Sequence, residues 1–152
     1  MGMELKTGTA ESTLDDKGRV SIPVRFRECF QGELIITWGS EQCAWIMTPA
    51  VWERFERSIR NSQVLSPKQR RQLEARHLEE ANTVELDKAG RIAIPTRTRK
   101  YANLTKDCLV IRSEDRLYIW DVATRDAYLS ENAPEAQEAW NLINDQDYLK
   151  AD

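Results

Sequence analysis

Alternating apolar and small side chains predict short strands at two places far apart in the chain. Residues 20–22 and 92–94 each alternate branched apolar residues with a serine or an alanine, which is typical of a half-buried strand. Pro23 and Pro95 follow directly. Each proline suits the first turn of a short helix, where the missing backbone N–H is not needed. The pattern therefore predicts a strand followed by a short helix at both places.

Helical periodicity appears in the middle and at the end of the chain. Apolar residues at positions 51, 52, 55 and 59 lie on one face of a predicted helix. Ser66, Pro67 and Gln69 form a start signal, with an N-cap, a first-turn proline and a capping-box glutamine. The further predicted helices are residues 67–80, residues 122–129 and a weaker acidic stretch at 134–149.

The chain contains an internal repeat. Residues 14–23 return as residues 86–95, 72 positions later, with six of the ten residues identical. The similarity continues through a predicted hairpin of two apolar runs in each copy. The sequence therefore predicts two copies of one strand-rich module, and so a mainly β fold with added helices (α+β). The matched runs are residues 34–37 with 109–112 and residues 44–47 with 117–120.

Each copy of the repeat begins with a turn of the form Asp-x-x-Gly-Arg. The side chains of Asp15 and Asp87 can accept hydrogen bonds from the turn backbone, and Gly18 and Gly90 can adopt the positive φ of a hairpin turn. These four residues are therefore predicted to shape the turns without any ligand.

The arginines of the repeat are the candidates for a binding role. Arg19 and Arg91 each lead a strand that is otherwise predicted to be buried, so their side chains should emerge beside the turn. A guanidinium donates two parallel hydrogen bonds and thereby suits phosphate and guanine. The alternative is that both arginines simply pair with the aspartates. The predicted DNA-binding residues are Arg19, Arg91, Lys17, Lys88, Arg25, Arg27, Arg97 and Arg99.

The total charge by itself does not favour nucleic acid, because the 152-residue chain has a net charge of -3. The charge is unevenly placed, however. Residues 14–27 contain four basic and two acidic residues, and residues 86–100 contain five basic and one acidic. Residues 131–152 contain six acidic residues and one lysine. Local patches govern attraction to phosphate, so the acidic tail does not remove the DNA-binding prediction.

Residue types suited to catalysis or metal binding are sparse. Cys29, Cys43 and Cys108 are widely spaced, and His77 is the single histidine, so neither a metal site nor a disulfide framework is predicted. The chain has no Gly-x-Ser-x-Gly elbow and no glycine-rich phosphate loop, so no catalytic residue and no cofactor are expected. His77 is expected at the surface or in an interface.

Membrane insertion and export are not predicted either. No apolar run approaches the ~18 residues that a bilayer span needs. Residues 1–10 have no apolar core like that of a signal peptide. A cytoplasmic protein without a membrane partner is therefore expected.

The motif Leu-Asp-x-x-Gly-Arg-[Val/Ile]-x-Ile-Pro resembles the hallmark of the SpoVT-AbrB domain, a swapped-hairpin DNA-binding module. Two such copies in one chain of this length resemble the MraZ family of bacterial transcriptional regulators. Further matches are Gly8, the Arg70-Arg71 pair and Ala81, and the similarity runs to about Asp126. Lys6-Thr7 stands where the family usually has an aromatic residue.

The resemblance implies an architecture and a function. It implies two interleaved modules that form an intramolecular pseudo-dimer barrel, and subunits that assemble into a ring. It also implies a nucleoid-associated repressor that binds promoter direct repeats upstream of a division and cell-wall gene cluster. The family's Asp-x-x-x-Arg feature corresponds to Asp15 with Arg19 and Asp87 with Arg91. The expected domains are residues 8–51 and 81–124, with a helical connector at 52–80 and an acidic helical tail at 125–152.

Two other functions stay open at the level of sequence. The same swapped-hairpin fold serves antitoxins, whose C-terminal extension binds a toxin, and the acidic tail at 131–152 could act in this way. An enzyme is the remote alternative, because no nucleotide-binding loop supports it.

Overall fold

The computed structural model describes residue 5 and residues 7–144. The chain forms two compact units, residues 1–122 and residues 123–152, and each is described by itself.

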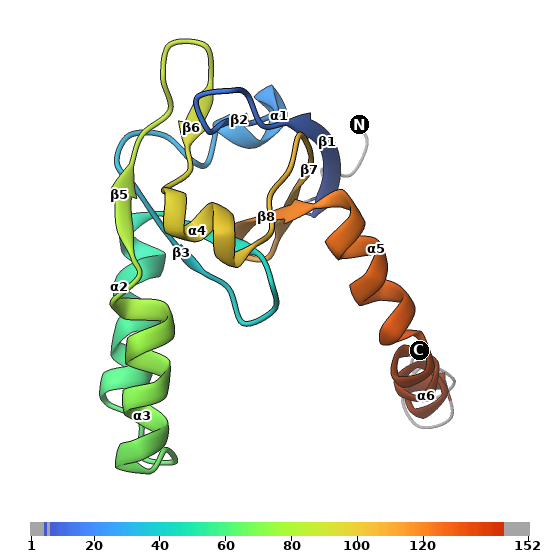
Figure 1. The fold of residues 1–152 in the computed structure, drawn as a ribbon. Coiled ribbons are helices and arrows are strands. Elements are labelled where there is room, and N and C mark those ends of the chain that lie inside the picture. Colours follow the sequence, from blue (N-terminus) through green and yellow to red (C-terminus); the bar gives the residue numbers. More distant parts are fainter. Residues whose placement is uncertain (1–4, 6, 145–152) are drawn as a thin grey trace. The chain divides into compact units, whose positions relative to one another are not determined.

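Figure 1 shows the elements in chain order. The first copy of the repeat contains β1 (Gly8–Thr13), β2 (Arg19–Ser21), α1 (Val24–Arg27), β3 (Leu34–Trp38) and β4 (Ala44–Met47). The connector contains α2 (Pro49–Arg60), α3 (Pro67–Leu73) and the π-helical turn η1 (Glu74–Leu78). The second copy contains β5 (Asn82–Val84), β6 (Arg91–Ala93), α4 (Thr96–Tyr101), β7 (Asp107–Ser113) and β8 (Arg116–Asp121), and α5 (Val122–Glu131) and α6 (Ala133–Ile143) follow.

The two copies of the repeat exchange their first strands. The described strands form a six-stranded sheet in the order β1-β7-β8-β4-β3-β5 and a separate pair, β2-β6. β1 of the first copy thus pairs with β7 of the second, and β5 of the second pairs with β3 of the first. Both pairings are antiparallel. The expected α+β fold with an interleaved, barrel-like pseudo-dimer is confirmed.

Strand register corrects one correspondence drawn from the sequence. Leu34 and Ile36 of β3 are fully buried, and their structural counterparts in β7 are the fully buried Cys108 and Val110. Ser12 of β1 and Val84 of β5 are equivalent positions, 72 residues apart. Ser12 lies opposite Cys108 and Val84 lies opposite Leu34, so Cys108 is the counterpart of Leu34. The match of residues 34–37 with 109–112 is therefore one residue out of register, which in a strand would turn every side chain to the opposite face. The match of residues 44–47 with 117–120 is consistent with the structure, because Trp45 lies opposite Tyr118 at the centre of the β4–β8 pair.

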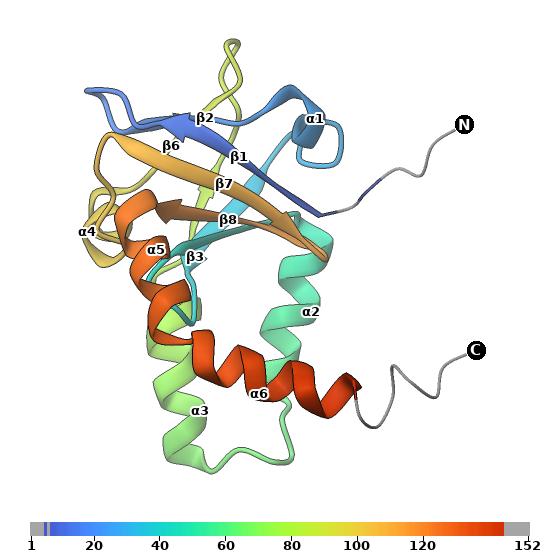
Figure 2. The same cartoon turned by 90° about the vertical axis from the view of Figure 1, so that its right-hand side faces the viewer.

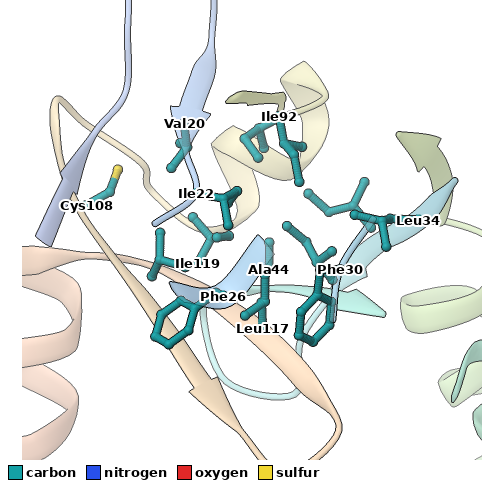
Figure 3. Packing of buried hydrophobic residues seen from close by; sticks show 14 residues of the cluster. Val20, Ile22, Phe26, Phe30, Leu34, Ala44, Ile92, Cys108, Leu117 and Ile119 are labelled. Atoms are coloured by element: carbon teal, nitrogen blue, oxygen red, sulfur yellow. The ribbon is translucent and has the colours of Figure 1, made fainter. Parts of the chain in front are cut away.

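One hydrophobic core serves both copies of the repeat. Figure 3 shows side chains from both copies pointing toward one another, with Ile22 and Leu34 from the first and Ile92 and Ile119 from the second. Burying one such side chain contributes about 1.5–3 kcal/mol to folding. Because the apolar faces of the two copies meet in this core, each copy depends on the other for burial.

The connector begins its helices as the sequence predicts. The side chain of Thr48 accepts a hydrogen bond from the Val51 N–H at the start of α2. Ser66 and Gln69 form a complete capping box at the start of α3. The predicted helix over residues 67–80 is α-helical to Leu73 and then widens into the π-helical η1. Helix position and start were thus predictable, and the change of helix type was not.

The expected surface or interface position of His77 is wrong. His77 lies in η1 and is only 4% exposed. Its Nδ1 lies 2.7 Å from the Trp38 carbonyl oxygen, and its ring stacks on Trp45 at a centroid distance of 5.1 Å. Burial lowers the pKa of His77 below its ordinary value of 6.5, so the ring is neutral at pH 7.

The second unit contains α5 and α6, where the sequence predicted helices at 122–129 and 134–149. Residues 145–149 of the second prediction lie outside the described residues. Neither helix contains a buried residue. Trp140, Leu142 and Ile143 of α6 are all at least 45% exposed. Along the described part of the chain, no helix is long and apolar enough to cross a membrane.

Candidate nucleic-acid interface

The two repeat turns have the same internal geometry. In the first turn, Asp15 Oδ1 accepts hydrogen bonds from the backbone N–H groups of Lys17 and Arg19, both at 2.9 Å. Asp87 Oδ1 accepts the equivalent bonds from Ala89 and Arg91, also at 2.9 Å. The turn glycines, Gly18 and Gly90, have φ of 77° and 79°, a conformation that glycine adopts readily and other residues rarely adopt. Asp and Gly therefore have backbone roles in both turns.

The fold brings these turns side by side through the β2–β6 pair. Val20 lies opposite Ile92 at the centre of this pair. The Ile22 N–H donates to the Gly90 carbonyl and the Ile94 N–H donates to the Gly18 carbonyl, both at 2.9 Å. In Figures 1 and 2 the β5–β6 turn and the α2–α3 pair lie at opposite ends of the first unit. The end with the turns is therefore separate from the connector helices.

Four charged side chains form an ionic quartet between the turns. Arg19 Nε lies 2.8 Å from Asp15 Oδ2, and Arg91 Nε lies 2.9 Å from Asp87 Oδ2. Each arginine also approaches the aspartate of the other turn, with Nη1 to Oδ2 distances of 3.8 and 3.9 Å. The quartet is electrically neutral, and its side chains are about one-third exposed. It links the two turns and still leaves part of each guanidinium accessible.

Local hydrogen bonds keep both aspartates of the quartet ionised. The backbone N–H of Arg19 is the main cause that lowers the pKa of Asp15, and the Arg19 side chain adds to it. The backbone N–H and side chain of Arg91 lower the pKa of Asp87 in the same way. The quartet therefore keeps its charges at neutral pH.

Arg27 and Arg99 cross to the turn of the other copy. The Arg99 guanidinium lies over Gly18, where an added Cβ would meet its Nη1 at 1.3 Å. The Arg27 guanidinium lies over Gly90 in the same way, with the closest approach to an added Cβ at 2.1 Å. Arg27 Nε also donates to the Ile22 carbonyl at 2.7 Å. The positive φ therefore favours glycine at both turns, and a side chain at either position would displace the arginine guanidinium that lies over it.

Lysines extend the basic surface around the turns. Lys17 and Lys88 lie exposed in the two turns. Lys100 also belongs to this surface, because it lines a groove of about 660 Å³ together with Asp15, Gly18 and Arg99. Lys100 was not among the sequence candidates, although its position next to Arg99 in the chain could have indicated it. We define the paired-turn face as residues 15–19 and 87–91 together with Arg27, Arg99 and Lys100.

Arg25 and Arg97 are placed away from the paired-turn face by their partners. Arg25 donates to the Thr9 carbonyl at 3.0 Å and lies over the Phe26 ring at 4.8 Å. Arg97 pairs with Glu80 at 2.8 Å, and this contact raises the pKa of Arg97 above its ordinary value. These two candidates are therefore not grouped with the other six.

Within the described part of the chain, side chains suited to nucleophilic or metal chemistry do not gather into a second site. Cys43 and Cys108 are buried, and burial raises the pKa of the Cys108 thiol to about 11, so that thiol stays protonated at neutral pH. The described residues include no group of three His, Cys, Asp or Glu side chains that could hold a metal ion.

The paired-turn face offers guanidinium and ammonium donors, which suit anionic phosphate and base-edge acceptors.

Known proteins are similar to this chain along most of its length. The chain matches the family described as "MraZ protein, putative antitoxin-like" over residues 5–75 and 78–145. It is 36% identical over 140 residues to a Treponema denticola protein named transcriptional regulator MraZ, which covers 91% of this chain and 97% of that protein. A protein of the same name from Treponema pallidum is also 36% identical over 140 residues, covering 91% and 94%. One from Frankia alni is 38% identical over 122 residues, covering 80% and 85%.

Proposed function

Because the chain belongs to the MraZ family, we propose that it is a DNA-binding transcriptional regulator and that the paired-turn face is its DNA-contacting surface. The observation that carries the proposal is the pairing of two equivalent arginine-bearing turns on one face, at the end of the unit away from the connector helices. The relatives named above are called transcriptional regulators, which supports a role other than that of an enzyme.

The residues of the face would have different roles. Lys17, Lys88 and Lys100 are exposed and would neutralise phosphates. Arg27 and Arg99 would each support the turn of the opposite copy and would offer the accessible edge of the guanidinium group to the duplex. Arg19 and Arg91 would orient the turns through the quartet and reach DNA with the accessible part of each guanidinium. Phosphate contacts of this kind position a protein on DNA, and base-edge contacts by arginine supply specificity.

We further propose that the protein acts as a ring oligomer on promoter direct repeats, as a repressor of the division and cell-wall gene cluster, in the cytoplasm at the nucleoid. The support is the family resemblance and the physics of repeated weak contacts. Tethered binding sites gain avidity of about 10²–10⁴-fold when their spacing fits the target. A single paired-turn face is small, so several copies in one assembly would supply the affinity.

The proposal is tested by binding selection on random duplex DNA, followed by titration of the selected duplex. We expect Arg19→Ala and Arg91→Ala to weaken binding about tenfold or more while fold and oligomeric state stay unchanged. Arg57→Ala is the matched control, because Arg57 is an exposed arginine of α2 and outside the face. Affinity that is unchanged in the Arg19 and Arg91 variants, or lost equally in the Arg57 variant, would contradict the assignment of this face.

An antitoxin-like protein-binding module is the second candidate function. The observation that favours it is the exposed apolar surface of α6, including Leu142 and Ile143. Removal of all residues after Ser130 separates the two functions. Loss of a co-purifying protein with DNA binding retained would favour a protein partner for the tail, whereas loss of DNA binding would assign the tail to the regulator itself.

A further inference from the structure

We infer that the two halves of the paired-turn face hold DNA unequally and that the half carrying Lys100 is the stronger. The inference rests on the proposed function and goes beyond it, because the repeat by itself suggests two equivalent halves.

Strand exchange makes each half of the face a composite of both copies. The first half consists of the first turn with Arg99 and Lys100 of the second copy, since Arg99 lies over Gly18 and Lys100 lines the groove beside that turn. The second half consists of the second turn with Arg27, which lies over Gly90, and Glu28 follows Arg27 at the end of α1. Lys100 and Glu28 occupy equivalent positions, 72 residues apart.

The charges of the two halves differ at three equivalent positions. Lys100 in the first half is matched by Glu28 in the second, and Lys17 is matched by Ala89. Both of these positions make the first half more positive. The third position makes the second half more positive, because Asp16 is matched by Lys88. The quartet residues are the same in both halves and neutralise one another, so they do not distinguish the halves.

The position of Lys100 makes this difference important for DNA. In the first half, Arg99 and Lys100 line the groove of about 660 Å³ beside the first turn together with Asp15 and Asp16. Asp15 is paired with Arg19, so Arg99 and Lys100 outnumber the one remaining carboxylate there. In the second half, the residue after Arg27 is an exposed carboxylate, which would repel a phosphate at the equivalent place. A duplex backbone has near two-fold symmetry, but this face does not. The half-site under the first half should consequently receive one more phosphate contact than the other.

The contribution of Lys100 is measured by titrating random-sequence duplex at several salt concentrations. We expect Lys100→Ala to weaken binding and to reduce the slope of log affinity against log salt by about 0.9, the value for one lost phosphate contact. Glu28→Ala, the matched variant at the equivalent position, should leave the slope unchanged or bind more tightly. Equal effects of the two variants, or an unchanged slope in Lys100→Ala, would overturn the inference.

The failure of this inference is distinguishable from the failure of the proposed function. A wild-type protein that binds duplex DNA, together with equal effects of Lys100→Ala and Glu28→Ala, would overturn the inference and leave the proposed DNA-contacting surface intact. A wild-type protein that binds no duplex at all would overturn both.

Discussion

At the scale of single residues, glycine at the turns has two separate functions. Gly18 has a positive φ, and its missing side chain also leaves the space that the Arg99 guanidinium occupies. Gly32 has a similar φ of 71° but no atom within 4 Å of an added Cβ. The two glycines therefore separate the backbone effect from the displacement of an arginine.

We predict that Gly18→Ala and Gly32→Ala both lose about 1–2 kcal/mol of unfolding free energy, since both place a side chain in the left-handed region. Gly18→Ala should in addition weaken DNA binding, because the new methyl group displaces Arg99. Denaturant unfolding and DNA titration of the two variants check this. Equal DNA affinity in both variants would show that the position of Arg99 does not matter for binding.

His77 provides a second prediction at this scale. Burial lowers its pKa in the fold, so the unfolded chain binds a proton at a higher pH than the folded chain does. Stability should be full above the ordinary value of 6.5 and should fall as the pH decreases below it. The lowered pKa values of Asp15 and Asp87 act only below their ordinary value of 3.8.

The measurement is the free energy of unfolding between pH 7.5 and about pH 4.5, the range in which a histidine with a lowered pKa titrates. His77→Phe is the control, because it keeps an aromatic ring against Trp45 and removes the only histidine of the chain. The decrease in stability from pH 6.5 downward should be much smaller in this variant. An equally large decrease in both proteins would assign the effect to other groups.

At the scale of elements, the connector helices are stabilised locally and lie outside the paired-turn face. Ser66→Ala removes the cap of α3 and should lower the free energy of unfolding by about 1 kcal/mol. Ser58→Ala is the control, because the exposed Ser58 hydroxyl donates to the Phe55 carbonyl within α2 and caps no helix. DNA affinity should be unchanged in both variants. A smaller effect of Ser66→Ala than of Ser58→Ala in thermal unfolding would contradict the role of the cap.

The two exchanged strands show the opposite situation, because their ladder partners come from the other copy. β1 pairs with β7 and β5 pairs with β3, so the backbone pairing of each exchanged strand depends on the other copy. The periodicity of residues 34–38 marked a strand correctly. It left open which face of that strand is buried and in which register it pairs, and this allowed the one-residue error in the correspondence with β7.

At the scale of the whole molecule, the duplication makes one chain equivalent to a dimer. We predict that residues 1–78 alone do not form a folded monomer, because β1 lacks β7 and the core lacks the second copy. The fragment should be unfolded, or it should associate into dimers in which a second fragment replaces the missing copy. Residues 1–122 should fold as a monomeric unit or a larger assembly of such units. Circular dichroism and sedimentation check both fragments, and a folded monomer of residues 1–78 would contradict the dependence of each copy on the other.

The sequence by itself determined the local features of this protein. The Asp-x-x-Gly turns, the strand-ending prolines and the caps at Thr48 and Ser66 depend on residues within a few positions of one another, so their residue types indicate them directly. The repeat and the family resemblance also lie in the sequence, and the resemblance implied the interleaved fold. Six of the eight basic candidates lie together on the paired-turn face.

Only the tertiary structure decided which distant residues meet. The pairing of Arg97 with Glu80, the position of Arg27 and Arg99 over the turns of the opposite copy and the burial of His77 all join residues far apart in the chain or contributed by different elements. Lys100 became part of the face for the same reason, through its position beside the first turn. Side-chain chemistry determines what each residue can bind, and the exchange of strands between the two copies determines which partners lie close enough to be bound.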